Sequence, residues 1–314
     1  MAANWMRRTA LVAACASAAL VAACGSSSIE SALKPDRLIA FGDSYSDVSV
    51  KRYSVNNDTI NNWTLQLMDH YYKNGSLRGG LISFAEGNAR ITASPDAAGS
   101  TDSSTITEQI DDFLAKKTLA PNDLLLINGG ISDLIVGMAA VRAGTLTPEQ
   151  FVADARKNGQ DLAAQVRRLV VGGATHIAVS GSYDLGKTPW AKAINQEALL
   201  SQASSRFNEA LLVAINDLSQ QVLYVDAAYY VNLYTTTPSS FSFNNATTPV
   251  CTSVDAGNGI GIGQGQINSA LCNTTTLLPD ANPDRYVFAD AVYLTPSAHR
   301  QLGTYAYDKL RARW

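Results

Sequence analysis

The chain has 314 residues and a net charge of −3, with 46% hydrophobic and 16% charged residues. It contains no marked cluster of lysine and arginine interleaved with aromatic residues, so the sequence argues against nucleic acid as a partner. The length fits one large α/β domain or two small ones.

The first 23 residues have the organisation of an export signal. Two arginines precede an apolar run over 9–23 that is too short to span a membrane. The run ends in small residues before Cys24 and resembles a bacterial lipobox, which implies cleavage before Cys24 and its lipidation. An ordinary secretory signal that contains a cysteine is the alternative. We expect a signal peptide over 1–23, a lipidated linker over 24–35 and a lipid-anchored protein of the bacterial cell envelope.

The residue after the lipobox cysteine bears on which membrane holds the anchor. It is Gly25 rather than aspartate, which in enteric-type sorting indicates the outer membrane. We therefore expect a protein that faces the periplasm or the cell surface, with a membrane as a partner through its lipid.

Five short apolar runs after the linker predict buried strands. They are continuous rather than alternating in hydrophobicity, as expected for parallel strands covered on both faces. They span 37–41, 81–84, 123–127, 176–180 and 221–225. Helical patterns over 151–171 and 196–218 lie between them. The alternation predicts a doubly wound, flavodoxin-like α/β sheet of about five parallel strands with flanking helices, in a domain over 36–314.

A serine follows the first predicted strand. The run over 37–41 leads into Gly42, Asp43 and Ser44, and we expect a helix to begin at Ser44. That position lies at the carboxyl edge of the sheet, where open α/β sheets bind ligands, and helix N–H groups there can stabilise an oxyanion. Alternatively, Ser44 or Asp43 only caps the helix. The local sequence alone leaves both readings open.

The segment 233–283 breaks the alternation of strands and helices. It is rich in Thr, Asn, Ser and Gly, but its glycine run over 257–265 lacks the lysine and the strand–helix unit of a phosphate-binding loop. We interpret 233–283 as an inserted loop, which in other proteins is often a lid or a substrate-contacting surface. Cys251 and Cys272 lie within it, and export predicts a disulfide between them. Neither has a nearby histidine, so no zinc site is expected.

The chain contains three histidines. His70 lies in a predicted helix and His176 opens a predicted strand at the edge opposite Ser44, so we expect structural roles for both. His299 follows an N-cap and a first-turn proline at 295–296, which places it at the carboxyl edge. Alternatively, His299 caps its helix or packs on the sheet.

Five segments, in order, resemble the blocks of the GDSL (SGNH) serine hydrolases. They are 41–47, 83–90, 128–133, 173–179 with 184–189, and 286–290. The resemblance implies an esterase or lipase that cleaves carboxylic esters through an acyl-enzyme, with no cofactor and no metal. It implies Ser44 as nucleophile, a histidine base, Asp290 as the group that orients the base, and the N–H of Gly87 as an oxyanion donor.

Two positions depart from the family pattern. Ser132 stands where the third block has asparagine, and it is either a shorter oxyanion donor or only a loop residue. Loss of one such donor typically costs about 10²–10³ in rate. Tyr293 stands where the fifth block has the catalytic histidine, and a tyrosine with a pKa near 10 is no base without a large shift.

The departure at Tyr293 leaves His299 as the best candidate for the base, although family members often carry a non-catalytic histidine there. The sequence thus supports an acyl-ester hydrolase with Ser44, Asp290 and His299. The alternative is an SGNH-fold binding or envelope lipoprotein with weak or no activity.

Overall fold

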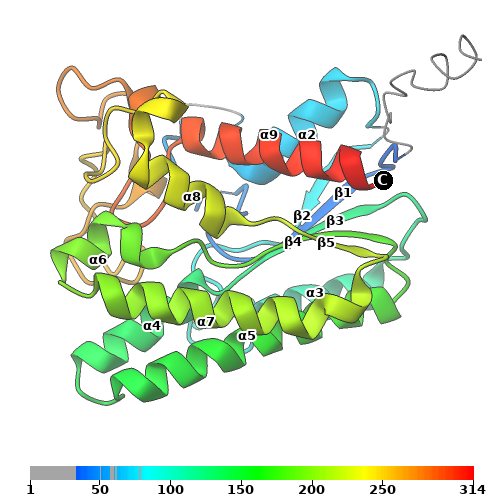
Figure 1. Cartoon of the computed structure of the whole chain (residues 1–314), viewed down its shortest axis with the longest axis horizontal. Coiled ribbons are helices and arrows are strands. Elements are labelled where there is room, and N and C mark those ends of the chain that lie inside the picture. Colours follow the sequence, from blue (N-terminus) through cyan, green and yellow to red (C-terminus); the bar gives the residue numbers. More distant parts are fainter. Residues whose placement is uncertain (1–32, 50, 57–59, 61, 78) are drawn as a thin grey trace, which may run out of the picture.

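The computed structural model describes residues 33–49, 51–56, 60, 62–77 and 79–314 (Figure 1). The expected signal peptide and the lipidation site Cys24 lie outside the described residues. In the described part of the chain, no helix combines the length and the apolar composition that a membrane crossing requires.

A five-stranded sheet forms the centre of the molecule, with every strand parallel and the order β2-β1-β3-β4-β5. The strands are β1 (Leu38–Phe41), β2 (Leu81–Ser83), β3 (Leu124–Asn128), β4 (His176–Ser180) and β5 (Val222–Tyr224). Leu38 pairs with Leu81 on one side and with Leu124 on the other. The predicted fold class is confirmed, and the order reverses between β1 and β3, which is where such sheets bind ligands.

Helices cover both faces of the sheet (Figure 1). They are α2 (Trp63–Lys73), α3 (Ile106–Lys116), α4 (Ile131–Arg142), α5 (Pro148–Val171), α6 (Pro189–Ala193), α7 (Glu197–Ile215), α8 (Ala227–Thr236) and α9 (Pro296–Arg313). Helices α2 and α9 pack on one face, whereas α3, α5 and α7 pack on the other. Because both faces are covered, β1 and β3 are buried throughout, which explains their continuous apolar sequences.

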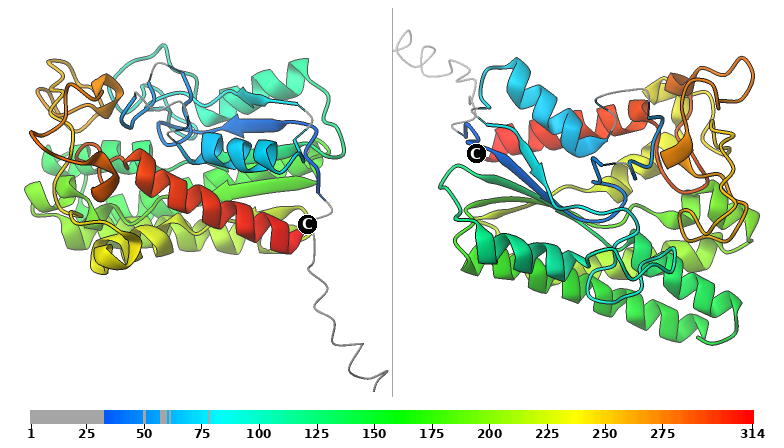
Figure 2. Two further views of the ribbon diagram at one scale, coloured as in Figure 1. Left: turned by 90° about the horizontal axis from the view of Figure 1, so that it is seen from above. Right: turned by 180° about the vertical axis from the view of Figure 1, so that it is seen from behind.

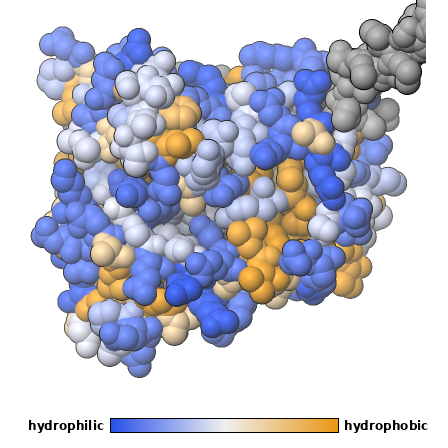
Figure 3. Space-filling view, viewed as in Figure 1, coloured by the Kyte–Doolittle hydropathy of each residue, from blue (hydrophilic) through white to orange (hydrophobic). Residues whose placement is uncertain are grey.

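Short 3₁₀ turns complete the secondary structure. They span Leu185–Lys187, Asn216–Leu218, Pro238–Phe241, Ser269–Leu271 and Pro283–Arg285. On the face shown in Figure 3 polar residues predominate, and a group of hydrophobic residues lies near α7 and β5. Leu212 and Val213 of α7 are exposed.

The chain does not form the predicted helix at Ser44 but a tight turn. The carbonyl of Asp43 accepts hydrogen bonds from the N–H groups of Ser46 and Asp47. Its carboxylate Oδ1 also accepts from the N–H of Tyr45 at 3.1 Å. Because aspartate bonds its own backbone in this way, it favours a turn over a continuing helix.

The segment between α8 and α9 runs over one end of the molecule, at the carboxyl edge of the sheet (Figure 2). Isolated bridges, such as Val254 with Ile267, replace regular strands in it. Cys251 and Cys272 form the expected disulfide, with their Cα atoms 5.9 Å apart. The disulfide packs with Val55 in a small core of its own.

Candidate active site

Ser44 lies at the carboxyl end of β1 and is only 2% exposed. Its Oγ accepts a hydrogen bond from the backbone N–H of Asn88 at 2.6 Å and donates to Asn88 Oδ1 at 3.3 Å. The Nδ2 of the same asparagine donates to the carbonyl of Gly259 at 2.9 Å. Asn88 therefore connects the candidate nucleophile to the glycine-rich run.

The backbone before Ser44 is held by polar side chains from neighbouring elements. The amide of Gln109 bonds both the N–H and the carbonyl of Gly42, at 2.9 and 3.0 Å. Gly42 has φ +152°, and a Cβ there would stand 2.0 Å from Asn128 Oδ1. Asn128 in turn donates to Asp43 Oδ1 at 2.6 Å. Glycine is therefore required at position 42. The hydrogen bonds of Gln109 and Asn128 hold the turn that carries Ser44 in position.

The backbone N–H that bonds Ser44 is that of Asn88, the residue after Gly87, which the resemblance implied as an oxyanion donor. The N–H of Gly87 donates to the buried Asp47 Oδ2 at 2.7 Å and is therefore not aimed at the serine. Asn88 has φ +68°, and asparagine is among the few residues that adopt this left-handed conformation readily. The Gly-Asn pair after β2 signals such a turn, but it does not tell which N–H faces the nucleophile.

Ser132 lies in the first turn of α4 and is fully buried. Its Oγ has no hydrogen-bond partner among the described residues. The helix begins after Gly130, whose φ is +109° and where a Cβ would stand 2.5 Å from the Phe207 ring. Ser132 thus has a free donor at the carboxyl edge, as an oxyanion role requires.

Asp43 is a buried carboxyl next to the nucleophile. Burial raises its pKa to about 6, while hydrogen bonds from Tyr45 and Asn128 oppose that shift. Its Oδ2 has no hydrogen-bond partner within the described part of the chain. At neutral pH the group carries a negative charge in a buried place.

Tyr293, at the position where the family has its catalytic histidine, is fully buried. Burial raises the pKa of its hydroxyl well above 10, and Asp43 raises it further, whereas the nearby Ser44 lowers it. The hydroxyl is close to Ser44 but does not reach hydrogen-bond geometry. Its ring packs on that of Tyr53 with the centroids 4.9 Å apart. Tyr293 therefore stays protonated at neutral pH, and its hydroxyl is neither a base nor a ready acid.

Asp290 is fully buried and accepts hydrogen bonds from three backbone N–H groups. Oδ1 accepts from Val292 and Tyr293 at 2.8 and 2.7 Å, and Oδ2 accepts from Ser269 at 3.1 Å. Burial raises the pKa of Asp290, and hydrogen bonds from Ser269, Tyr293 and Val292 oppose the shift. Asp290 thus fastens the turn before α9 to the loop closed by the disulfide.

His299 occupies the first turn of α9, whose N-cap is Thr295 as predicted. Its ring is buried, with the centroid 5.0 Å from that of Tyr45, and burial lowers its pKa to about 3. Its Nδ1 has no partner among the described residues. In that part of the chain no hydrogen bond joins the ring to Ser44 or Asp290, so the three predicted catalytic residues are not linked as a relay.

The other two histidines lie away from Ser44 in structural surroundings. His70 of α2 stacks on Tyr307 with centroids 4.8 Å apart and contacts Thr304 Oγ1 at 3.1 Å. His176 opens β4 and packs against Trp314. Neither is placed to serve the candidate site.

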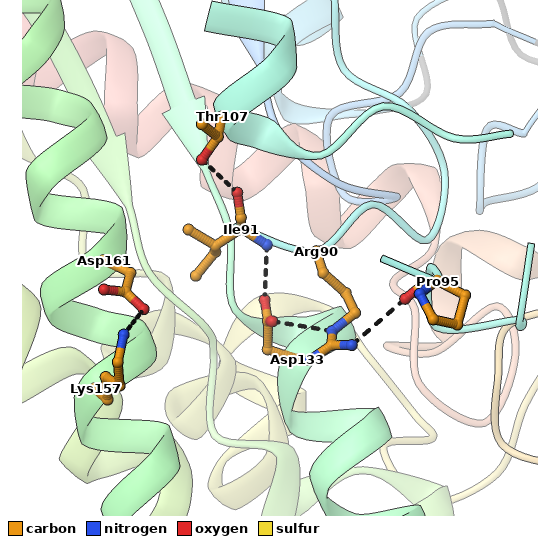
Figure 4. A network of polar contacts seen from close by, with 7 residues as sticks. All are labelled: Arg90, Ile91, Pro95, Thr107, Asp133, Lys157 and Asp161. Carbon is orange, nitrogen blue, oxygen red and sulfur yellow. Dashed lines mark hydrogen bonds and ion pairs between the residues drawn. The ribbon is translucent and has the colours of Figure 1, made fainter. Parts of the chain in front are cut away.

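An ion pair ties α4 to the segment that follows Asn88 (Figure 4). Asp133 accepts from Arg90 Nε at 3.2 Å and from the N–H of Ile91 at 3.1 Å. Arg90 also donates to the carbonyl of Pro95 at 3.4 Å. Both side chains are largely buried, so the pair holds the first turn of α4 against the turn that carries Asn88.

Among the described residues, no group of three or more His, Cys, Asp or Glu side chains is arranged to hold a metal ion.

Comparison with known proteins identifies one family. The model of the GDSL-like lipase/acylhydrolase family matches residues 38–305. A Pseudomonas putida protein, described as an uncharacterized protein in the trpE-trpG intergenic region, is 27% identical over 194 residues. Those residues make up 62% of this chain and only 30% of that relative's length.

Solved structures are also similar to this chain. A member of the lipolytic protein G-D-S-L family from Veillonella parvula has a TM-score of 0.46 and 11% identity, over 87% of this chain and 96% of its own. The inhibitor-bound aryl esterase of M. smegmatis has a TM-score of 0.46 and 17% identity, over 89% of this chain and 100% of its own.

Proposed function

The chain belongs to the GDSL-like lipase/acylhydrolase family, and from this premise we propose that it hydrolyses carboxylic esters with Ser44 as the nucleophile. The contact of the Asn88 N–H with Ser44 Oγ at 2.6 Å carries the proposal. It fixes the position of the oxygen that would attack, at the ligand-binding edge of the sheet.

In the proposed reaction, Ser44 Oγ attacks the acyl carbon of the ester, and its proton passes to a base. The bond between the acyl carbon and the alcohol oxygen then breaks, and the alcohol leaves with a proton. Water attacks the acyl-enzyme, releases the carboxylic acid and restores the serine. The N–H groups of Asn88 and Ser44 and the hydroxyl of Ser132 are the proposed donors to the oxyanion.

We propose His299 as the base and Asp290 as its orienting group. The burial that lowers the pKa of His299 to about 3 keeps its ring neutral, and a neutral imidazole can accept a proton. The ring must come into contact with Ser44 for this step. The low pKa also weakens His299 as a base, because each pKa unit corresponds to about 1.4 kcal/mol.

One observation favours a second candidate function, an SGNH-fold binding lipoprotein with little or no activity. Tyr293 replaces the histidine that the family uses, and no base is bonded to Ser44 among the described residues. In such a protein the site holds a ligand without cleaving it.

Hydrolysis of short-chain p-nitrophenyl esters tests the proposed enzyme. Protein beginning at Ser26 is expected to turn over p-nitrophenyl acetate, and Ser44→Ala is expected to abolish turnover. Ser49→Ala, a change of an exposed serine five residues away, is the matched control and is expected to retain activity. No turnover by the parent protein, or equal turnover by Ser44→Ala, would contradict the enzyme and favour the binding lipoprotein.

The same assay tests the base. His299→Ala is expected to lower kcat by about 10²–10⁴, the usual contribution of a positioned acid or base. If His299→Ala matches the parent protein while Ser44→Ala is inactive, the nucleophile stands and the base is another group.

We further propose that Cys24 anchors the protein to the envelope through lipid. In cells that export the chain, Cys24→Ser is expected to move the protein from the membrane fraction to the soluble fraction. Cys15→Ser, a cysteine in the expected signal peptide, is the matched control and should leave the fractionation unchanged. Membrane fractionation of the Cys24→Ser protein equal to that of the parent would contradict the anchor.

A further inference from the structure

A cleft of about 410 Å³ opens close to the turn that carries Asn88. Its walls come from 95–99, from α4, from α6 and from the glycine-rich segment, by which we mean residues 257–265. Val136 and Ala139 of α4, Trp190 of α6 and Ile262 give it a mainly apolar lining. Apolar clefts of this size, with a few polar groups, are the usual binding sites of small ligands.

The cleft adjoins the proposed oxyanion donor. Ala97, which lines the cleft, donates its N–H to the carbonyl of Asn88 at 3.0 Å. Neither Tyr45 nor His299 lines it. Since the leaving alcohol must depart on the side of the group that protonates it, a cleft on the Asn88 side suits the acyl part of an ester.

The glycine-rich segment contacts both the Asn88 turn and a wall of this cleft. Gly259 accepts from Asn88 Nδ2 at 2.9 Å, and Asn258 Nδ2 donates to the carbonyl of Ala98 at 3.1 Å. Gly261 packs so closely on Ala97 that a Cβ there would stand 2.3 Å from the Ala97 carbonyl oxygen. The segment thus bridges the Asn88 turn and the wall of the cleft.

The backbone of the segment is suited to changing conformation between fixed ends. Four of its glycines have positive φ, from +44° to +120°. Glycine crosses between positive and negative φ at little cost, so rearrangement at these four positions meets little backbone strain. The ends are held by the bridge of Val254 with Ile267 and by the hydrogen bond of Asn268 Nδ2 to Asp255. Both ends of the segment are therefore anchored.

We propose that this cleft binds the acyl chain of the ester substrate, and that the glycine-rich segment is the gate that joins the cleft to Ser44. The inference rests on the proposed ester hydrolysis. Ser44 is 2% exposed, so a substrate reaches it only when a covering segment moves. Movement of Gly259 breaks its contact with Asn88 and thereby frees the asparagine that holds the serine hydroxyl.

Filling the cleft tests the acyl site. Ala139→Trp places a large ring in the cleft, and Ala153→Trp, which fills a groove between α5 and α7, is the matched control. On p-nitrophenyl esters from acetate to octanoate, Ala139→Trp is expected to lower kcat/KM for octanoate about tenfold or more and to leave acetate within about twofold. Ala153→Trp is expected to change neither. An equal effect of Ala139→Trp on both esters overturns the proposal.

A second ester series distinguishes the acyl group from the alcohol. Acetates of alcohols from ethanol to octanol vary only the leaving group, and Ala139→Trp is expected to affect all of them equally. If the variant selects against octyl acetate rather than against octanoate esters, the cleft binds the alcohol and the acyl assignment is overturned.

The gate is tested by the rate at which an alkyl fluorophosphonate labels Ser44. Asn258→Ala removes the hydrogen bond to Ala98 and is expected to speed labelling several-fold. Gln264→Ala changes an exposed side chain of the same segment and is the control. Equal labelling rates in the parent protein and Asn258→Ala overturn the gate.

Direct binding separates this inference from the proposed reaction. Calorimetry with octanoate on Ser44→Ala protein is expected to show binding that a further Ala139→Trp change abolishes. Binding of this kind together with an absence of ester turnover supports the cleft and contradicts only the hydrolysis. No octanoate binding to Ser44→Ala overturns the cleft, whatever the turnover.

Discussion

Burial shifts the pKa values of two groups at the turn that carries Ser44, in opposite directions. Burial raises the pKa of Asp43 to about 6 and lowers that of His299 to about 3. On folding, Asp43 therefore binds protons more readily and His299 less readily than in the unfolded chain. Both charged forms are costly in the fold, and shifted pKa values of this kind cluster at functional sites.

The pKa of His299 predicts a loss of stability in acid. The folded-state pKa lies below the ordinary 6.5, so the unfolded chain takes up the proton first as the pH falls. The contribution of the neutral ring to stability is complete above about pH 6.5 and is lost progressively as the pH falls toward about 3. Glutamine does not titrate. Between pH 7 and pH 4.5 the free energy of unfolding should therefore fall by about 2–3 kcal/mol less in His299→Gln than in the parent protein.

Urea unfolding of both proteins at the two pH values measures this difference. Asp43 acts in the opposite direction between about 3.8 and 6, but it is present in both proteins and cancels in the comparison. Equal pH dependence in the parent protein and His299→Gln would show that the ring is protonated without cost and is not buried as described.

The sequence predicts which residues lie at the site better than it predicts which of their atoms face Ser44. The family blocks predicted Ser44 as the nucleophile and Tyr293 as a departure from the pattern, and the structure brings these two side chains close together. The same blocks assigned Gly87 as a donor, yet its N–H bonds Asp47 and the N–H of Asn88 reaches the serine. Which N–H faces the nucleophile depends on φ angles, which the sequence does not state.

At the scale of elements, the strands were predicted to within one or two residues. Their apolar runs have clear ends, and the strands therefore begin and end close to the predicted residues. For β4 (His176–Ser180) the predicted and observed bounds are the same. Helix α5 begins at Pro148 instead of the predicted 151, because Thr147 and Gln150 form a reciprocal capping box that extends the helix backward. Hydrophobic periodicity locates the apolar face of a helix, whereas side-chain hydrogen bonds to the backbone decide its ends.

The ion pair that attaches α4 to the Asn88 turn is expected to stabilise the fold. Asp133 and Arg90 are largely buried, so removal of one charge leaves the other in a poorly solvated place. Asp133→Asn is expected to lower the free energy of unfolding by about 2–4 kcal/mol. Asp161→Asn breaks the pair of Asp161 with Lys157 along α5 (Figure 4) and is expected to cost about 0.5 kcal/mol or less, because Lys157 is exposed.

Urea unfolding of the two variants at neutral pH makes the comparison. A cost for Asp133→Asn as small as that for Asp161→Asn would mean that the buried pair does not hold α4 in place.

At the scale of the whole molecule, the candidate site is assembled at one edge of the sheet from segments far apart in the chain. Ser44 follows β1, Asn88 follows β2 and Ser132 follows β3, as the topology of a parallel sheet dictates. The segment between α8 and α9 then covers this edge, and its path was not predictable. It has no apolar period, and its bridges and turns depend on contacts with distant residues.

The disulfide is expected to hold this covering segment to the rest of the molecule. Cys251 donates its N–H to the carbonyl of Ala289, next to Asp290, and the carbonyl of Cys272 accepts from the N–H of Asn56. The disulfide therefore links two segments that each bond a distant part of the chain. Closing a loop with a sequence separation of 21 stabilises by about 3 kcal/mol in the chain-entropy model. The double variant Cys251→Ser/Cys272→Ser should therefore lose about 3 kcal/mol, and reduction of the parent protein should produce the same loss.

Unfolding in urea with and without dithiothreitol tests this expectation. The reductant should destabilise the parent protein and leave the double variant unchanged. The double variant is therefore also the control for other effects of the reagent. Limited proteolysis adds a local measure, because loss of the bond should expose the chain between 252 and 271 before the sheet unfolds. If cleavage instead begins in α5 or α7, the disulfide stabilises the fold as a whole and not the segment that covers Ser44.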